Sequence, residues 1–207
     1  MSQFFLVHPE NPQPRLIKQA AEIIRKGGLI IFPTDSAYAL GCHLGDKKAL
    51  DKIRTIRQLD KDHNFTLMCR DLSELSLYAK FDNQLYRSLK AHTPGPFTFI
   101  LEGTPEVPRR LLHKKRKTIG LRVPKSHITL ALLEELGEPI MSVSLIMPED
   151  EYPLTDTHDI RSILEHSVDL IIDGGHCGLE LTTVVDLSGG YPEIVRQGIG
   201  KFEDAVL

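Results

Sequence analysis

The sequence of 207 residues has only three cysteines and no apolar run long enough to cross a membrane. Cys42, Cys69 and Cys177 are odd in number and widely spaced, which is typical of a reduced chain rather than a disulfide framework. The N-terminal segment has neither the basic region nor the long apolar region of a signal peptide. We therefore expect a cytoplasmic protein without a membrane partner.

The common signatures of nucleotide and metal sites are also missing. No G-x-G-x-x-G string occurs, and "GIGKF" near the C-terminus fails as a phosphate-binding loop because Val195 and Phe202 occupy required positions. No Cys-x-x-Cys pair is present, which argues against structural zinc. The Cys-His neighbours at 42–43 and 176–177 are adjacent pairs, which do not easily both face one ion. We therefore predict no metal site built by the protein alone.

Charge is unevenly distributed, although the net charge of −3 implies no general attraction to nucleic acid or membranes. Residues 109–117, "RRLLHKKRK", hold six Lys or Arg and no acid, whereas residues 149–159 hold five acids and no Lys or Arg. The basic run indicates either an ordinary solvated surface or a contact for RNA phosphates. Its candidate RNA-binding residues are Arg109, Arg110, Lys114, Lys115, Arg116 and Lys117.

Helical and strand patterns alternate along the chain. Helices are expected over 16–26, after Asp46, over 72–79 and 83–91, from Ser126 to Gly137, and near 160–166. Strands are expected over 29–32, 65–69, 97–102, 118–123, 139–146, 169–173, 182–187 and 193–197. The late strands have short connections, so we predict a twisted open α/β sheet of mixed parallel and antiparallel strands flanked by helices. One domain over 1–207, with its core at about 12–200, is the simplest organisation.

Hydroxyl and arginine side chains recur where the predicted strands end. Each has an ordinary structural explanation, because Ser and Thr cap turns and Thr suits strands. As a set they are also suited to a small anionic ligand, since open α/β sheets bind ligands at strand ends and guanidinium groups match phosphate or carboxylate. The candidates are Thr34, Ser36, Arg122, Ser142, Ser144, Thr182 and Arg196.

Five segments in this order resemble the YrdC-like family, which includes the L-threonylcarbamoyladenylate synthases: "FPTDSAYALGC", "TPGPFTFIL", "LRVP", "TTVVD" and "IVRQG". The likeness covers about residues 12–200 and is greatest for the YciO branch. It implies a YrdC-like fold with a basic concave site. It also implies synthesis of threonylcarbamoyl-AMP from threonine, bicarbonate and ATP with Mg²⁺, for tRNA modification.

The resemblance also implies roles for individual residues. Thr34 and Ser36 would line the end of the site that takes threonine and its carbamoyl group. Arg122 would bind the carboxylate, while Thr182 and Arg196 would hold the phosphate and ribose of the adenylate. Ser142 would contribute to the same binding site.

Two motifs of the synthases are altered in this chain. Their Lys-x-Arg at the end of the second helix corresponds to Arg57-Gln58-Leu59, followed by Asp60 where the synthases have proline, and their downstream lysine corresponds to His63. Their Ser-x-Asn corresponds to Ser144-Leu145-Ile146. Arg57 and Ser144 are therefore the remaining catalytic candidates, and His63 is a binding candidate. Since phosphoryl chemistry depends on such donors, we expect the synthase activity to be weak or altered.

Two functional hypotheses remain. The first is a divergent enzyme that binds an adenine nucleotide or an acyl-adenylate and synthesises or hydrolyses it slowly. The second is a non-catalytic module that binds RNA, double-stranded or as tRNA or rRNA, through shape and phosphate contacts. An adenylate pocket and a basic surface could also serve one RNA substrate together.

Overall fold

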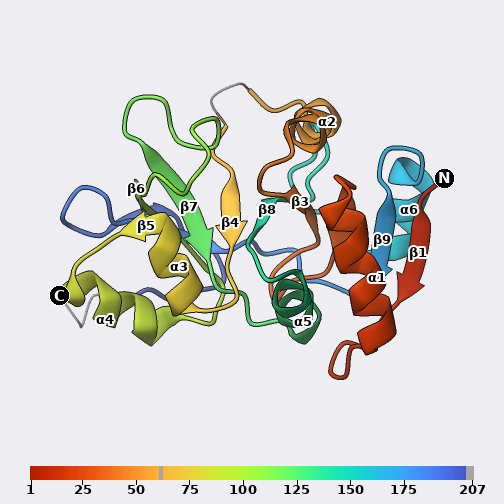
Figure 1. Ribbon diagram of the computed structural model, residues 1–207, viewed down its shortest axis with the longest axis horizontal. Helices are drawn as coiled ribbons and strands as arrows, with labels where there is room; N and C mark the ends of the chain where they lie inside the picture. Colours follow the sequence, from red (N-terminus) through yellow and green to blue (C-terminus); the bar gives the residue numbers. More distant parts are fainter. Residues whose placement is uncertain (61–62, 204–207) are drawn as a thin grey trace.

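The helices of the protein begin and end close to where the sequence places them. The computed structural model describes residues 1–60 and 63–203, so positions 61–62 and the last four residues of the predicted domain lie outside the described part. In chain order, the helices of the described part are α1 (Pro14–Arg25), α2 (Lys47–Arg57), α3 (Leu72–Tyr78), α4 (Asn83–His92), α5 (His127–Leu136) and α6 (Thr157–Leu164) (Figure 1).

Local side chains account for these boundaries. The Asp46 carboxylate accepts a hydrogen bond from the backbone N–H of Ala49 at 2.9 Å and so caps α2, as predicted. Ser126 caps α5 in the same way, and Gly137 ends that helix with a φ of 76°, a conformation that glycine adopts without strain. The last helix begins earlier than expected, at Thr157, because Asp156 caps its N-terminus.

The strands form one mixed sheet. They are β1 (Gln3–Leu6), β2 (Ile30–Phe32), β3 (Ala39–His43), β4 (Thr66–Met68), β5 (Ala79–Lys80), β6 (Phe97–Gly103), β7 (Thr118–Arg122), β8 (Ile140–Ser144), β9 (Leu170–Asp173), β10 (Thr183–Asp186) and β11 (Glu193–Arg196). Their order is β1-β9-β2-β3-β8-β4-β7-β6-β10-β11, and β5 pairs with β6. The sheet contains parallel pairs such as β4–β7 and antiparallel pairs such as β4–β8, which confirms the predicted mixed α/β sheet.

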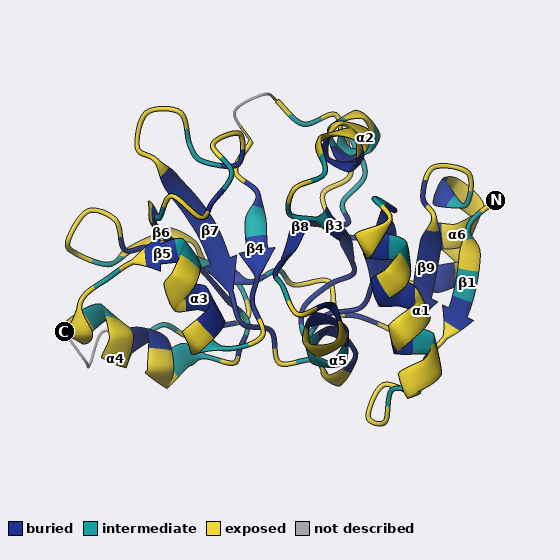
Figure 2. Ribbon diagram, in the orientation of Figure 1, coloured by how far each residue is buried: buried dark blue, intermediate teal, exposed yellow. Residues whose placement is uncertain are grey.

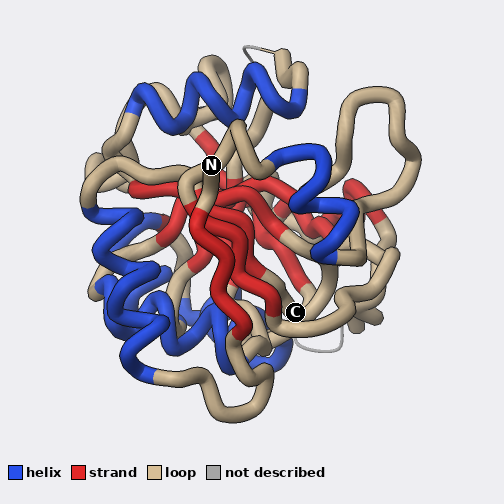
Figure 3. The backbone as a smooth tube through the Cα atoms, turned by 90° about the vertical axis from the view of Figure 1, so that its right-hand side faces the viewer, coloured by secondary structure: helices blue, strands red, loops and turns tan. Residues whose placement is uncertain are grey.

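Apolar side chains are buried on both faces of this sheet. On one face, α1 and α5 pack over β9, β2 and β3, and their core includes Ile24, Phe32 and Leu132. On the other face a larger core joins α2, α3, α4 and α6, with Ile31 and Leu67 among its members. Viewed from the side, the strands pass between the helices (Figure 3), and the central strands are the most completely buried part of the molecule (Figure 2).

Three strands were not predicted. β1 and β5 are short and lie at the margins of the sheet. β3 is central, but its sequence contains Ala39 and Gly41, which have low strand propensity. Within the described residues, no helix has the length and hydropathy that a membrane span requires.

Candidate functional site

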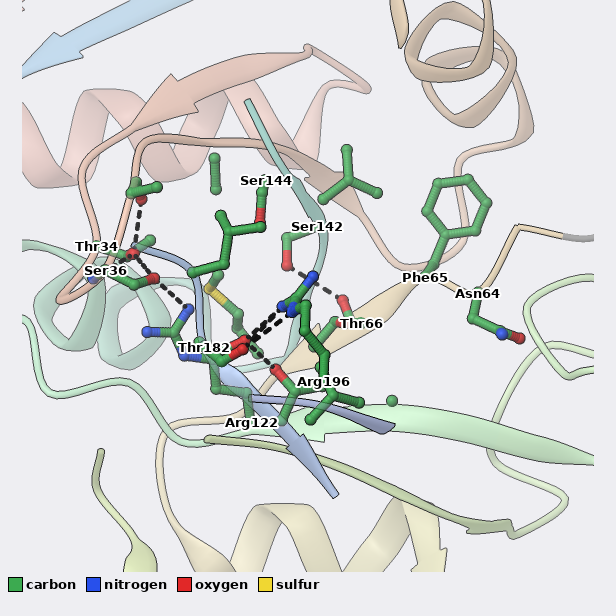
Figure 4. Close-up of a pocket in the computed structure, with 18 of the residues that line it drawn as sticks. Thr34, Ser36, Asn64, Phe65, Thr66, Arg122, Ser142, Ser144, Thr182 and Arg196 are labelled. Atoms are coloured by element: carbon green, nitrogen blue, oxygen red, sulfur yellow. Dashed lines mark hydrogen bonds between the residues drawn. The ribbon is translucent and has the colours of Figure 1, made fainter. Parts of the chain in front are cut away.

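All nine predicted pocket residues line one cavity of about 250 Å³. They come from separate parts of the chain: the β2–β3 loop, the end of α2, the α2–β4 loop, β7, β8, and the strands near the C-terminus. The set is Thr34, Ser36, Arg57, His63, Arg122, Ser142, Ser144, Thr182 and Arg196, most of which are labelled in Figure 4. The structure therefore brings these residues together, whereas their individual roles remain predictions.

The main pocket occupies a part of one sheet face that the helices leave uncovered. α1 and α5 pack on this face over β9, β2 and β3, but Arg57 is the only helical residue among the described residues that line the pocket. Small side chains form its floor, since Thr66 on β4 pairs with Ser142 on β8 and with Gly120 on β7. The space above them is therefore open to a ligand.

The hydroxyl groups of the β2–β3 loop form hydrogen bonds within the loop. The Thr34 hydroxyl donates to the Ala37 carbonyl at 2.7 Å and accepts from the Ser36 backbone N–H at 3.1 Å. The Ser36 hydroxyl accepts a hydrogen bond from the guanidinium of Arg122 at 3.2 Å. The two explanations of this turn are therefore compatible: its side chains fix the loop and also line the pocket.

Arg122 is buried and ion-paired. Its Nη2 lies 2.5 Å from Oδ1 of Asp35, a residue that was not among the sequence candidates. Burial lowers the pKa of the Arg122 guanidinium from its ordinary value, and the Asp35 carboxylate opposes that shift. Within the described residues, the Arg122 Nε and the Asp35 Oδ2 are both buried without a hydrogen-bond partner. One donor and one acceptor are thus left unused beside the pocket.

Arg196 is held in place by Thr182, the residue before β10. Its Nε and Nη2 donate to the Thr182 carbonyl at 3.2 and 2.9 Å, and the Thr182 hydroxyl lies 3.0 Å from that of Thr98 (Figure 4). Partial burial lowers the pKa of Arg196. The guanidinium is therefore pre-positioned at the pocket without a carboxylate partner among the described residues.

Arg57 and His63 form the side of the pocket where the synthase motif is altered. Arg57 is the last residue of α2, and its Nε is buried without a hydrogen-bond partner among the described residues. Burial lowers the pKa of His63, and the nearby charges of Arg57 and Arg54 lower it further. His63 therefore adds no positive charge at neutral pH. Leu59 packs against the apolar core rather than lining the pocket.

Sequence analysis missed several residues that line the pocket. Asn64, Thr66 and Thr98 supply further polar groups, and Leu181, Val184 and Val195 form an apolar surface near Arg196. The signal for Thr66 was present, because it lies on a predicted strand three residues after the candidate His63. The apolar group gave no signal, since such residues are common in any sheet. Ile146 also lines the pocket, at the altered motif position.

The structure divides the basic run between two surroundings. Arg116, on the loop between β6 and β7, forms an ion pair with Asp186, with a distance of 2.6 Å between Nη1 and Oδ2. Arg109, Arg110 and Lys114 instead line a second, smaller cavity. Lys115 and Lys117 are exposed. The run is therefore not a uniform basic surface, and its binding to RNA stays a prediction.

No cluster of three or more His, Cys, Asp or Glu that could hold a metal ion occurs in the part of the chain that the structure describes. His43 lies 3.0 Å from Glu138, whereas Cys177 contacts the Thr34 carbonyl, so the two Cys-His pairs have different neighbours.

Comparison with known proteins identifies relatives along nearly the whole chain. The Sua5, YciO and YrdC family model, described as "Telomere recombination", matches residues 22–198. The YciO protein of Escherichia coli strain K12 is 60% identical over 200 residues, which cover 97% of both chains. The crystal structure of E. coli YciO superposes with a TM-score of 0.94 and 59% identity, covering 97% of this chain and 98% of that one.

The comparisons also find synthases at greater distance. The threonylcarbamoyl-AMP synthase of Pyrococcus abyssi is 30% identical over 185 residues, which cover 88% of this chain and 54% of that protein. The structure of P. abyssi Sua5 complexed with L-threonine has a TM-score of 0.87 and 28% identity, covering 95% of this chain and 58% of that one. The chain thus spans about half the length of this synthase.

Proposed function

Because the chain belongs to the Sua5, YciO and YrdC family, we propose that its main pocket binds an adenine nucleotide or an adenylate resembling threonylcarbamoyl-AMP. One observation carries this proposal. Residues from Thr34 to Arg196 surround a single cavity that has three arginines and no carboxylate among its described lining residues. Such an environment favours phosphate and carboxylate groups over neutral ligands.

Two groups of lining residues suggest how this ligand is bound. Arg196 adjoins the apolar side chains of Val184 and Val195, which suit a base and ribose with a neighbouring phosphate. Arg122 and Ser36 line the same pocket, where the unpartnered Nε of Arg122 suits the carboxylate of an amino acid. The relation to a P. abyssi protein crystallised with L-threonine supports threonine as the further substrate.

The same pocket argues for weak or altered chemistry. Leu59 is half-buried against the apolar core, Ile146 presents an apolar side chain, and His63 is neutral at neutral pH. Removal of one donor that stabilises a reacting group commonly costs ~10²–10³ in rate. We therefore propose slow synthesis or hydrolysis of the adenylate, with Arg57 and Ser144 as the remaining catalytic groups.

Magnesium fits this site only together with the nucleotide. The described lining residues include no carboxylate, and Asp35 is engaged with Arg122. Mg²⁺ prefers oxygen ligands and retains water, so the phosphates of ATP would supply its main contacts.

The three cysteines are free and buried, which supports the proposed cytoplasmic location.

The direct test incubates the wild-type protein with ATP, threonine and bicarbonate and measures AMP and pyrophosphate. A thermal-shift titration with AMP and ATP measures binding independently of turnover. We expect nucleotide binding with slow product formation. Absence of both turnover and binding at millimolar nucleotide would contradict the proposal.

A sharper prediction restores the altered motif. The double variant Leu59→Arg/Ile146→Asn is expected to raise synthase turnover by at least about tenfold, because it adds an amide at a position that lines the pocket and a cation two residues after Arg57, which also lines it. Leu77→Arg, an exposed position on α3, adds the same charge away from the pocket and serves as the control. Equal turnover in wild type and double variant would refute the proposed cause of weak activity.

RNA binding is a second candidate function, supported by the exposed lysines of the basic run. The variant Lys114→Ala/Lys115→Ala/Lys117→Ala leaves the Arg116–Asp186 ion pair intact. Its matched control is Lys47→Ala/Lys48→Ala/Lys52→Ala, which removes three exposed lysines from α2. A gel-shift titration over salt should show weaker RNA binding and a smaller salt dependence only in the first variant. Equal RNA binding by both variants would exclude the basic run as the RNA contact.

A further inference from the structure

A further cavity, the α5 cavity, lies at the beginning of α5 and has a volume of about 400 Å³. Its lining includes segments that follow three mutually parallel strands: Glu10 after β1, Asp35 after β2 and His176 after β9. Open α/β sheets bind ligands beyond the carboxyl ends of such strands. Among the described lining residues, Thr34 alone is shared with the main pocket. The α5 cavity is therefore a separate candidate site.

The α5 cavity contains a carboxylate with an unused hydrogen-bond acceptor. Asp35 lines this cavity and not the main pocket, and its side chain is 11% exposed. Its Oδ1 is paired with Arg122, whereas its Oδ2 is buried without a hydrogen-bond partner among the described residues. A buried carboxylate oxygen without a donor is costly, so a ligand that donates a hydrogen bond here is favoured. An ammonium group makes such a bond with the help of its charge.

The beginning of α5 supplies unused donors to the same cavity. The Ser126 hydroxyl accepts from the backbone N–H of Thr129 at 3.3 Å, whereas the N–H groups of His127 and Ile128 have no partner among the described residues. A helix N-terminus carries partial positive charge and so favours a carboxylate. Lys125 also lines the cavity, and it is exposed and forms no ion pair within the described chain. A carboxylate in the cavity would therefore meet several donors.

The remaining ionisable groups do not change this balance. His127 is paired with Glu10, with 3.1 Å between Nδ1 and Oε2, and both side chains are exposed. The Cys177 thiol contacts the Thr34 carbonyl at 3.7 Å, and burial raises its pKa to about 11, so it is neutral at neutral pH. The α5 cavity thus combines an unsatisfied carboxylate with an ammonium and a helix N-terminus.

We propose that the α5 cavity binds a free α-amino acid, with its ammonium group at Asp35 and its carboxylate at Lys125 and the N-terminus of α5. A zwitterion satisfies the acceptor and the donors together. A lone anion would also face the Asp35 carboxylate, and a lone amine would also face Lys125. This site does not depend on nucleotide binding in the main pocket.

The test uses L-serine as the probe and follows the backbone amide signals of the protein by NMR titration. The amide signals of His127 and Ile128 should shift as the serine carboxylate binds beside them. N-acetyl-L-serine lacks the ammonium group and L-serinamide lacks the carboxylate. Each should bind at least about tenfold more weakly than serine, the effect of one lost charge-assisted contact.

Lys125→Glu tests the carboxylate contact without weakening the helix, because an acidic residue before α5 suits its N-terminus. It replaces an attraction by a repulsion and should weaken serine by about tenfold, whereas Lys125→Arg should retain binding. Lys18→Glu is the matched control, since Lys18 is exposed on α1 and does not line the cavity.

Two results would overturn the proposal: equal serine affinity of Lys125→Glu and wild type, or shifts confined to amides of the main pocket such as that of Thr98. Serine binding that depends on Lys125 in a protein that binds no nucleotide would support the α5 cavity and contradict only the proposed function.

Discussion

Asp35 and Arg122 form a buried ion pair beside the main pocket. Both side chains are almost completely buried, and they meet through one short contact between Nη2 and Oδ1. Burying two charges is costly, and the cost is recovered only when each compensates the other. Removal of one partner therefore leaves an uncompensated charge in a region with little water.

Asp35→Asn is expected to lower the free energy of unfolding by about 3 kcal/mol, because it leaves the Arg122 charge buried without its counter-ion. Denaturant unfolding measures this loss. The double variant Asp35→Asn/Arg122→Met should recover part of it, since the remaining charge is then also removed. If the double variant loses as much stability as Asp35→Asn and Arg122→Met lose separately when summed, the two residues are not coupled.

His63 predicts a specific pH dependence of nucleotide binding. Its pKa is lowered by burial and by Arg57 and Arg54 in the free protein, while Asp60 acts in the opposite direction. A bound phosphate favours the protonated ring and raises this pKa, so binding takes up a proton. Affinity for AMP should therefore increase as the pH falls from the pKa of His63 in the complex to the lower pKa of His63 in the free protein.

His63→Gln provides the comparison for this prediction. The phosphate of AMP also titrates near pH 6, but its contribution is the same for both proteins. Calorimetry across this range should show the extra increase at low pH in wild type and not in His63→Gln. Identical pH profiles would exclude His63 as a ligand contact.

The sequence predicted the members of the pocket better than their partners. Thr34, Ser36 and Arg196 could be selected because hydroxyl and guanidinium groups follow strands. The partnership of Asp35 with Arg122 could not, since the two are 87 positions apart and only the folded sheet brings them together. A carboxylate among hydroxyls is also an ordinary feature of turns.

At the scale of the elements, β3 shows where propensity gives too little information. This strand pairs with β2 and β8, so it lies in the middle of the sheet. Gly41 weakens its sequence signal, but the position requires a small residue. A Cβ at Gly41 would lie 2.6 Å from a Phe32 ring carbon and 2.8 Å from an Ile140 methyl group. Tertiary packing therefore determines both the residue and the missed prediction.

Gly41→Ala is expected to lower the free energy of unfolding by about 1–3 kcal/mol, because the added methyl overpacks a buried strand. Gly189→Ala is the matched control, since a Cβ there meets nothing within 4 Å. Denaturant unfolding of the two variants measures the difference. A Gly41→Ala protein as stable as the control would show that β2 and β8 shift apart at little cost.

For the whole molecule, the alternation of helices and strands predicted the mixed sheet but not the strand order. β10 joins β6 in parallel, although 86 positions separate their first paired residues, Thr183 and Phe97. Connection lengths alone do not specify such a pairing. The pocket depends on that order, because it brings Thr98 on β6 within hydrogen-bonding distance of Thr182 before β10.

The spread of the pocket residues from position 34 to position 196 also matters during synthesis. A chain emerging from the ribosome has no complete cavity until Arg196 has been translated and β11 has paired with β10. A ligand of this pocket would therefore bind the complete chain and not a nascent chain that lacks Arg196. A bound nucleotide would stabilise the final pairing of β11 with β10 and would have no effect on the earlier folding steps.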